Sequence, residues 1–556
     1  MTTNRETSGG ALLVRQLEML GAEVAFGVPG ESYLPVLDAF LDGPIRFVAC
    51  RQEGGAAMMA EAWGKLTGAA GLCFVTRGPG ATNASAGVHV ARQDSTPMLL
   101  FVGDVARGHR GREAFQEVDL VAMFSPLAKA AMRIDAAARI PELVFRAHRL
   151  AMSGRPGPVV VVLPEDVLGE RTDAAPLPPV PPADAWPSPA QVAALADRLA
   201  AAERPFLLVG GPGWTAEACA GLAGLAERWQ VPVGVSFRCQ DLIDNDHPCY
   251  AGHVGIGIDP ALATRIRDAD LLIVLGARLG EMTTGGYRLP QAPRPRQQLV
   301  HVHPDPDEPG HAYRPDLAIT AGMAAAVAAF AEIPPPSRGG VGVADTEASH
   351  AAWQRFATPI DMPGEVPLGA MVRALETHLG AGGIVTNGAG NFSIWLHRHY
   401  RWHRRGTQLA PTSGSMGYGL PAAVAAALAY PGRDVACWSG DGCFLMHGQE
   451  LATAVALGLK LLIVVVDNSQ YGTIRMHQER RYPGRVSGTA LVSPDFVALA
   501  RAYGADGEAA DDLAGFEAAL ARAAATEGPY LIHVRLPGTR LTPGLTLADL
   551  QGRQPG

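Results

Sequence analysis

Short apolar runs that stop at small polar clusters recur along this chain of 556 residues. The runs "DVACWS" and "LLIVVV" end in "GDG" and "DNSQYG", and segments with helical spacing separate such runs. A strand that is apolar throughout must be covered on both faces, which is typical of a parallel sheet flanked by helices. The pattern therefore predicts doubly wound α/β folds, in which ligands bind at the carboxyl ends of the strands.

Two proline-rich stretches divide the chain, at residues 173–190 and 333–340. Proline fixes φ and has no amide donor, so both stretches suit exposed connectors better than helices or central strands. Three doubly wound α/β domains with mostly parallel sheets are expected at 1–175, 190–335 and 360–540, followed by a C-terminal tail at 541–556.

Composition narrows the class of partner. The net charge is −8 and no block of lysine or arginine stands out, so nucleic acid and anionic membranes are not expected partners. No apolar run has the ~20 residues that a bilayer requires, and the first residues lack the apolar core of a signal peptide. The seven cysteines have no metal-binding or redox spacing and suit a reducing compartment. We expect a cytoplasmic protein that binds small molecules.

Asp441 and Asn468 each follow an apolar run, so we expect them at neighbouring strand ends. A carboxylate and an amide oxygen there can share an octahedral Mg²⁺, whose other ligands are usually water and phosphate. The glycines beside Asp441 would let the backbone approach that phosphate. Taken alone, "GDG" also fits a tight turn in which Asp441 caps the next helix. The second motif downstream favours the metal site.

The two motifs together resemble the signature of thiamin-diphosphate-dependent enzymes. The resemblance extends over nearly the whole chain and is strongest to acetolactate synthase (acetohydroxyacid synthase) catalytic subunits and their relatives. It implies that 1–175 is a pyrimidine-binding domain, 190–335 a central domain and 360–540 a diphosphate-binding domain. The blocks that carry it, in family order, are "FGVPG", "RQEGGAAMMAEAWGKLTG", "TRGPGATN", "AFQEVD", "GRPGPVVVVLPEDV", "TSGSMGYGLPAA" and "GDGCFLMHGQELATAV".

The resemblance implies thiamin diphosphate and Mg²⁺ as cofactors. Asp441, Asn468 and the backbone carbonyl of Gln470 would be the metal ligands. The segment "NGAGN" at 387–391 and the amides after Gly442 would hold the diphosphate. The full set of further expected cofactor contacts is Pro29, Gly388, Ala389, Gly390, Asn391, Gly440, Gly442, Cys443, Tyr471 and Gly472.

Three more residues are implied at the reacting end of the cofactor. Glu53 would hydrogen-bond the aminopyrimidine, where a proton on the far ring nitrogen promotes the imino tautomer that deprotonates thiazolium C2. The carbonyl of Gly414 would accept from the amino group, and Met416 would be the apolar wedge between the two rings. Without the family, Glu53 reads as a helix-start carboxylate and Met416 as a core methionine.

The resemblance also implies a 2-keto acid substrate, whose decarboxylation leaves an enamine that is either protonated or adds to a second carbonyl. The strand-end turns of the first domain contain no paired histidines, which favours ligation. The leading interpretation is an acetolactate synthase-like transferase that joins two pyruvates, as in branched-chain amino acid biosynthesis. Alternatives are a non-oxidative 2-keto acid decarboxylase, a carboligase for another 2-keto acid or aldehyde, and a scaffold without activity.

Several residues bear on the choice of substrate. Phe115, Gln116 and Lys129 match positions near the substrate in acetolactate synthases, with a core aromatic, a surface amide and a solvated lysine as alternatives. Arg77 stands where serine is common and could bind a carboxylate. His477 stands where the family has a substrate-selecting tryptophan, with a surface-helix histidine as the alternative.

The central domain holds a second candidate site. Arg278 in "GARLGEMTTG" resembles a flavin-contacting arginine, and the turn "VGGPGW" suits a pyrophosphate. FAD with a structural role and a vestigial site both fit this pattern. In the resembled family the two ends of thiamin diphosphate are held by different chains, so a homodimer or homotetramer with active sites between chains is implied.

Overall fold

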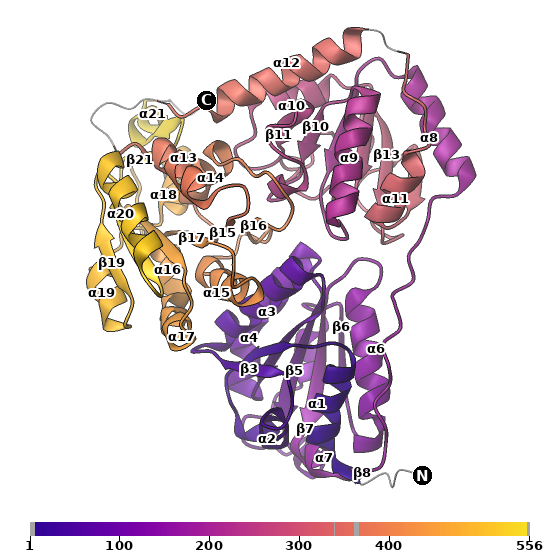
Figure 1. The fold of residues 1–556 in the computed structure, drawn as a ribbon, viewed down its shortest axis with the longest axis vertical. Coiled ribbons are helices and arrows are strands. Elements are labelled where there is room, and N and C mark those ends of the chain that lie inside the picture. Colours follow the sequence, from indigo (N-terminus) through magenta and orange to yellow (C-terminus); the bar gives the residue numbers. More distant parts are fainter. Residues whose placement is uncertain (1–5, 338–339, 361–365, 553–556) are drawn as a thin grey trace.

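The computed structural model describes residues 6–337, 340–360 and 366–552. The chain forms three α/β domains, each built on a six-stranded parallel sheet (Figure 1). The central and third domains lie side by side, and the first domain lies against both, with helices α3 and α15 at its junction with the third (Figure 1). The predicted fold class is confirmed. In the part of the chain that the structure describes, no helix is long and apolar enough to span a bilayer.

The first domain has the strand order β3-β2-β4-β5-β7-β6, and the short strands β1 and β8 pair beside it. Its strands are β1 (Thr7–Ser8), β2 (Val24–Gly27), β3 (Arg46–Ala49), β4 (Gly71–Val75), β5 (Met98–Asp104), β6 (Ala130–Arg133), β7 (Pro158–Pro164) and β8 (Arg171–Thr172). Its α-helices are α1 (Gly9–Met19), α2 (Leu34–Phe40), α3 (Glu53–Thr67), α4 (Gly78–Asp94), α5 (Leu120–Phe124), α6 (Ile140–Met152) and α7 (Glu165–Gly169).

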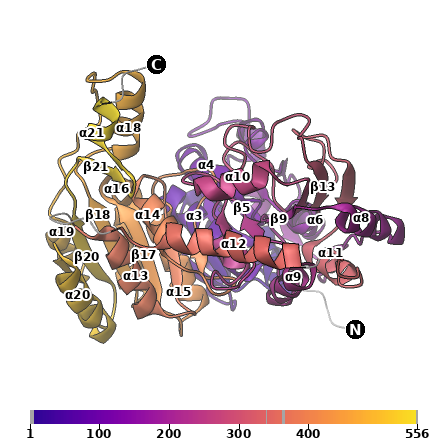
Figure 2. The same cartoon turned by 90° about the horizontal axis from the view of Figure 1, so that it is seen from above.

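The central domain has the strand order β11-β10-β9-β12-β13-β14. Its strands are β9 (Pro205–Val209), β10 (Val233–Val235), β11 (Tyr250–His253), β12 (Leu271–Leu275), β13 (Gln298–His303) and β14 (Leu317–Thr320). Its helices are α8 (Pro189–Ala201), α9 (Ala216–Trp229), α10 (Pro260–Arg267) and α11 (Met323–Phe330), and α12 (Gly340–Ala357) packs on β11 and leads to the third domain (Figure 2).

The third domain has the strand order β16-β15-β17-β18-β20-β19. Its strands are β15 (Ile384–Asn387), β16 (Gln408–Leu409), β17 (Val435–Gly440), β18 (Leu462–Asp467), β19 (Asp506–Ala509) and β20 (Tyr530–Arg535). Its α-helices are α13 (Leu368–Leu379), α14 (Phe392–His399), α15 (Gly419–Ala429), α16 (Asp441–His447), α17 (Leu451–Ala456), α18 (Gly472–Arg481), α19 (Phe496–Ala502) and α20 (Leu513–Ala525).

The connector after the first domain and the C-terminal tail both contact helices of the domains. Residues 173–188 form neither helix nor strand, and Gln16 holds them to α1 through hydrogen bonds of 2.9 and 2.7 Å with Leu177. The expected tail contains β21 (Arg540–Thr542), β22 (Leu545–Thr546) and α21 (Leu547–Gln551), and α21 packs on α18. Parts of the expected connector 333–340 and tail 541–556 lie outside the described residues.

The apolar runs are buried on both faces, as expected for central parallel strands. In β7, Val160 and Val162 join a core with α3, α4 and α15, whereas Val159 and Val161 join a core with α1 and α6 on the other face. The first of these cores also includes residues of β17 and β18 in the third domain. The first and third domains therefore share one hydrophobic core.

The crossing of α3 and α4 depends on a glycine. A Cβ at Gly87 would lie 2.4 Å from the Cβ of Ala57, so Gly87→Ala must push the two helices apart. We expect a loss of about 1–3 kcal/mol in stability, as for other overpacked core positions. Gly224→Ala in α9 is the matched control, because a Cβ there meets nothing within 4 Å.

Thermal unfolding of the two purified variants measures the difference. Gly224→Ala should unfold at or above the parental midpoint, since alanine is ~1 kcal/mol better than glycine inside a helix. A Gly87→Ala variant with the parental midpoint would contradict the tight crossing.

Candidate active site

Asp441 and Asn468 lie side by side at the carboxyl edge of the third sheet. Strands β17 and β18 are parallel neighbours, with Gly440 opposite Val466. Asp441 follows directly as the first residue of α16, and Asn468 is the first residue after β18. The register of the two strands thus brings together the carboxylate and the amide that the sequence pairs at neighbouring strand ends.

A second carboxylate, which sequence reasoning missed, stands at the same edge. Asp467 Oδ1 lies 2.9 Å from Ser493 Oγ, which in turn lies 3.3 Å from Asp441 Oδ2. Burial raises the pKa of Asp441 to about 6, and the charge of Asp467 adds to this shift. Burial opposes ionisation of Asp467 as well, but hydrogen bonds from His533 and Ser493 outweigh it and hold its pKa below the usual range. This edge concentrates the oxygen ligands and negative charge that a hard cation prefers.

The chain turns sharply after Asn468, as the expected metal-binding loop requires. Ser469 has φ +50°, and the carbonyl of Gln470 accepts from the amide of Gly472 at 2.8 Å, which leaves its second lone pair for another partner. The amide of Tyr471 donates to the carbonyl of Thr489. A Cβ on Gly472 would lie 2.8 Å from Asn468 Nδ2, so only glycine fits without moving that amide.

The expected diphosphate cradle lies at the end of the next strand, β15, beside β17. A Cβ on Gly388 would lie 2.3 Å from the sulfur of Cys443, and Gly390 has φ +153°. Asn391 Oδ1 accepts from the hydroxyl of Thr473 at 2.9 Å. Glycine at both positions lets this turn pack closely on Cys443 and Phe392, and such a compact glycine turn suits the approach of a diphosphate.

The segment with Gly414 and Met416 faces the same region. Gly414 is exposed with φ +70°, and Met416 is half-buried rather than a core methionine. Directly after it, the amide of Gly417 donates to Cys443 Sγ at 3.2 Å, and its carbonyl lies 3.1 Å from His447 Nδ1. The segment is therefore held at its downstream end against α16.

Glu53 is the first residue of α3, and its Oε2 accepts from Asn83 Nδ2 at 2.9 Å. No other hydrogen bond to its carboxylate occurs in the described residues, which leaves Oε1 open. Two third-domain residues fix the start of α3. Buried Glu450 accepts from the amides of Arg51 and Gln52 at 3.1 and 3.0 Å, and His447 Nε2 lies 3.1 Å from Gln52 Oε1. Burial raises the pKa of Glu450.

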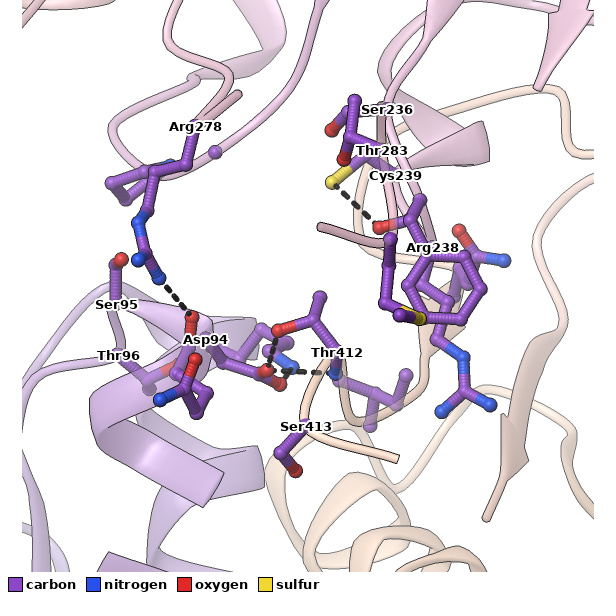
Figure 3. Close-up of a pocket in the computed structure, with 18 of the residues that line it drawn as sticks. Asp94, Ser95, Thr96, Ser236, Arg238, Cys239, Arg278, Thr283, Thr412 and Ser413 are labelled. Carbon is purple, nitrogen blue, oxygen red and sulfur yellow. Dashed lines mark hydrogen bonds and ion pairs between the residues drawn. The ribbon is translucent and has the colours of Figure 1, made fainter. Parts of the chain in front are cut away.

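A cavity of about 930 Å³ lies where the three domains meet (Figure 3). Arg278 lines it, donating to the carbonyl of Gln93 and pairing with Glu308, both at 3.3 Å. Further lining residues are Lys65, Asp94, Gly211, Trp214, Thr215, Arg238, Ala389, Gly390, Asn391, His397, Thr412, Ser413 and Gly414. Three of these present buried polar atoms that have no hydrogen-bond partner among the described residues, namely Arg238 Nε, His397 Nε2 and Ser413 Oγ. The cavity thus extends from the turn at Gly211 in the central domain to the glycine cradle of the third domain.

The residues expected near the substrate are distributed over the first domain. Lys129 donates to the carbonyls of Ser153 and Arg155 at 2.5 and 2.8 Å, and burial lowers its pKa to about 8. Gln116 has φ +62°, and its carbonyl accepts from Gly78. Phe115 is 70% exposed, which excludes a core aromatic within one chain.

Arg77 does bind carboxylates, but those of its own chain. Its guanidinium lies 2.7 Å from Glu31 and 2.9 Å from Glu165. His477 is exposed on α18 and does not line the cavity, whereas Thr473 of the same helix contacts the cradle. Pro29 is exposed at the end of the β2 turn.

The chain has three doubly wound domains, and the third bears a carboxylate and a glycine cradle at adjoining strand ends. This arrangement is typical of α/β proteins that bind a phosphorylated cofactor. Family models agree: residues 7–123 match the N-terminal TPP binding domain of thiamine pyrophosphate enzymes, 192–330 their central domain and 388–534 their C-terminal TPP binding domain. The chain belongs to the thiamine pyrophosphate enzyme family.

Similar proteins match over nearly the whole length. The acetolactate synthase large subunit of Parasynechococcus marenigrum is 34% identical, covering 95% of this chain and 87% of the relative. The acetolactate synthase isozyme 2 large subunit of Escherichia coli is 32% identical, covering 95% of both. The probable acetolactate synthase large subunit of Methanocaldococcus jannaschii is 30% identical, covering 96% and 94%. These matches confirm the resemblance found in the sequence.

The cradle geometry makes a prediction about cofactor affinity. In Gly388→Ala the new methyl and the sulfur of Cys443, 2.3 Å apart, cannot both keep their places, so thiamin diphosphate should bind at least about tenfold more weakly. Calorimetric titration with the cofactor measures this. Gly432→Ala, where a Cβ meets nothing within 4 Å, is the control in the same domain.

A second substitution tests whether the clash with Cys443 causes the loss of affinity. Gly388→Ala combined with Cys443→Ala should regain part of the affinity, because it removes the sulfur. Parental affinity in Gly388→Ala alone would remove this position from the cradle.

Proposed function

We propose that the protein is a thiamin-diphosphate- and Mg²⁺-dependent carboligase of the acetolactate synthase type. It would decarboxylate pyruvate, or a similar 2-keto acid, and ligate the remaining unit to a second 2-keto acid. One observation carries the proposal: the adjacent ends of β15, β17 and β18 bear a glycine cradle, a carboxylate and an amide. Relatives named acetolactate synthase that match the chain nearly from end to end support it.

The residues at these strand ends fit the cofactor. Asp441, Asn468 and the carbonyl of Gln470 would hold Mg²⁺ through oxygen, and Asp467 would add negative charge beside them. At Gly388 and Gly390 a side chain would meet Cys443 and Phe392, so glycine there would keep the turn compact beside the diphosphate. When bound, thiamin diphosphate supplies an electron sink for decarboxylation.

Glu53 would hold a proton at the aminopyrimidine ring nitrogen. Its Oε1 makes no hydrogen bond among the described residues, while Asn83 orients Oε2 from α4. Glu450 and His447 keep the start of α3 in place, so the position of the carboxylate does not depend on a mobile loop. The carbonyl of Gly414 would accept from the amino group, and Met416 would separate the rings.

Two chains would complete each site. In one chain, no hydrogen bond joins Glu53 to the third domain within the described ranges, and Glu53 is not part of the cavity that includes the cradle. Exposed Phe115 also suits a neighbour that covers it. We therefore propose a homodimer or homotetramer with active sites between chains. All seven cysteines are free, which supports a reducing compartment, for which we propose the cytoplasm.

FAD is the second cofactor that the cavity would accept. The turn at Gly211 leads to Thr215 at the N-terminus of α9, where backbone amides suit a pyrophosphate. The unpartnered atoms of Arg238, His397 and Ser413 would find partners on a polar ligand. Arg278, now paired with Glu308, would contact the flavin.

Product analysis tests the proposed reaction. With pyruvate as the only substrate, we expect acetolactate as the main product and little free acetaldehyde, measured as a ratio that does not depend on enzyme concentration. Excess acetaldehyde would favour a non-oxidative decarboxylase. No turnover of pyruvate or any other 2-keto acid tested would favour the scaffold alternative.

Replacement of Glu53 tests the mechanism. Glu53→Gln should bind the cofactor but slow hydrogen–deuterium exchange at C2 by ~10²–10⁴-fold, because an amide cannot hold or release the proton as a carboxyl group does. The control is Glu142→Gln, which alters an exposed carboxylate in the first turn of α6 that pairs only with Arg139 in the described structure. Equal exchange in both variants would reduce Glu53 to a helix-start carboxylate.

A further inference from the structure

The segment that carries Gly414 and Met416 is anchored outside its own domain. Upstream, the amide of Thr412 donates to Asp94 Oδ1 at 2.7 Å, and the Thr412 hydroxyl also donates to this oxygen (Figure 3). Asp94 is the last residue of α4 in the first domain, and its side chain is 1% exposed. A buried carboxylate that accepts two hydrogen bonds from one residue fixes that residue closely.

Lys65 holds Asp94 in place. Its ammonium pairs with Asp94 and with Glu61 at 3.1 Å, and donates to the carbonyl of Ala410 at 3.3 Å. Burial disfavours the ammonium, but the charges of Asp94 and Glu61 outweigh burial and raise the pKa of Lys65. The Lys65 ammonium therefore keeps its charge, and the Lys65–Asp94 pair reaches two residues of the segment, Ala410 and Thr412.

The downstream end of the segment is anchored to α3, the helix that also carries Lys65. Tyr418 donates to Glu61 Oε2 at 2.5 Å, and Thr96 donates to the other carboxylate oxygen at 2.7 Å. From the central domain, the guanidinium of Arg238 donates to the carbonyl of Pro411. Buried side chains of two other domains thus hold residues 410–412 and 418.

Between these anchors, Gly417 is held by Cys443 and His447, whereas residues 413–416 make few contacts with other parts of the chain. The amide of Gly414 donates to the carbonyl of Pro411 at 3.2 Å, and Ser415 Oγ donates to the carbonyl of Met416 at 3.3 Å. Ser413 Oγ has no partner among the described residues. On its upstream side, the path of the segment to Met416 therefore depends on where the anchors hold residues 410–412.

We propose that Asp94, held by Lys65, is a positioning residue that sets the place of the Gly414–Met416 segment against the two rings of the cofactor. The inference rests on the proposed function, in which Met416 is the wedge and Gly414 the acceptor. Asp94 acts on this segment through Thr412 and not by contact with the rings of thiamin diphosphate. Since a shift of ~1 Å at a reacting group can cost about 10²-fold in rate, loss of this anchor should appear in C2 deprotonation rather than in cofactor affinity.

A double-mutant cycle tests the proposal. The variants are Asp94→Ala, Met416→Ala and the double variant, each measured by hydrogen–deuterium exchange at C2 of bound thiamin diphosphate at saturating cofactor and Mg²⁺, by cofactor affinity and by thermal midpoint. Asp246→Ala is the control, because it also breaks an ion pair between domains, at 2.9 Å from Arg401, but does not touch the segment.

We expect Asp94→Ala to slow C2 exchange by about tenfold or more while Asp246→Ala leaves it unchanged. In the Met416→Ala background the same loss of Asp94 should have little further effect, because residues that act through one element are not additive. Asp94→Asn, which keeps an acceptor for Thr412, should recover part of the exchange rate. If Asp94→Ala does not fold, Thr412→Val replaces it, since it removes only the hydroxyl contact.

Each contrary result has a separate meaning. If Met416→Ala exchanges at the parental rate, the wedge assignment of the proposed function is wrong and this inference falls with it. If Met416→Ala is slow but Asp94→Ala is parental, or if the two losses simply multiply, Asp94 does not position the segment and the proposed function stands.

Discussion

The packing of α3 between α4 and α15 is the contact on which the other features depend. The buried residues of these helices form one core with strands of both the first and the third sheet. Small side chains make the approach close: α15 has the sequence GLPAAVAAALA, and Gly87 of α4 meets Ala57 of α3. Because two sheets share this layer, neither domain can move without exposing apolar surface to water. The positions of Glu53, Asp94 and the cradle are consequences of this shared core.

Buried carboxylates fix the relative orientation of the first and third domains, which hydrophobic contact alone does not determine. Glu450 binds the start of α3, Glu61 binds Tyr418, and Asp94 binds Thr412, each across the junction of the first and third domains. Hydrophobic burial brings the helices together but does not fix their rotation or register. A buried acceptor left without its donors is costly, so these pairs select one alignment of the domains.

Much of the fold and part of the candidate site followed from the sequence, because both depend on local order along the chain. Apolar runs predicted buried parallel strands, and parallel register placed Asp441 beside Asn468. Ser493 and His533 could not be found in this way, since folding alone brings them to Asp467. The partners of Arg77 and Lys129 were likewise hidden. The sequence does not show that Arg77 pairs with glutamates 46 and 88 residues away. Nor does it show that Lys129 donates to a carbonyl just after the end of α6.

The cavity at the junction is lined by residues of three separate domains, so no isolated domain contains it. A molecule that binds there contacts all three domains only when they are assembled. Its binding stabilises the assembled state by RT ln(1 + [L]/Kd) relative to states in which one domain is displaced or unfolded. Binding at this place is therefore linked to domain assembly. A mutation that merely loosens the junction would weaken binding without altering any residue that touches the ligand.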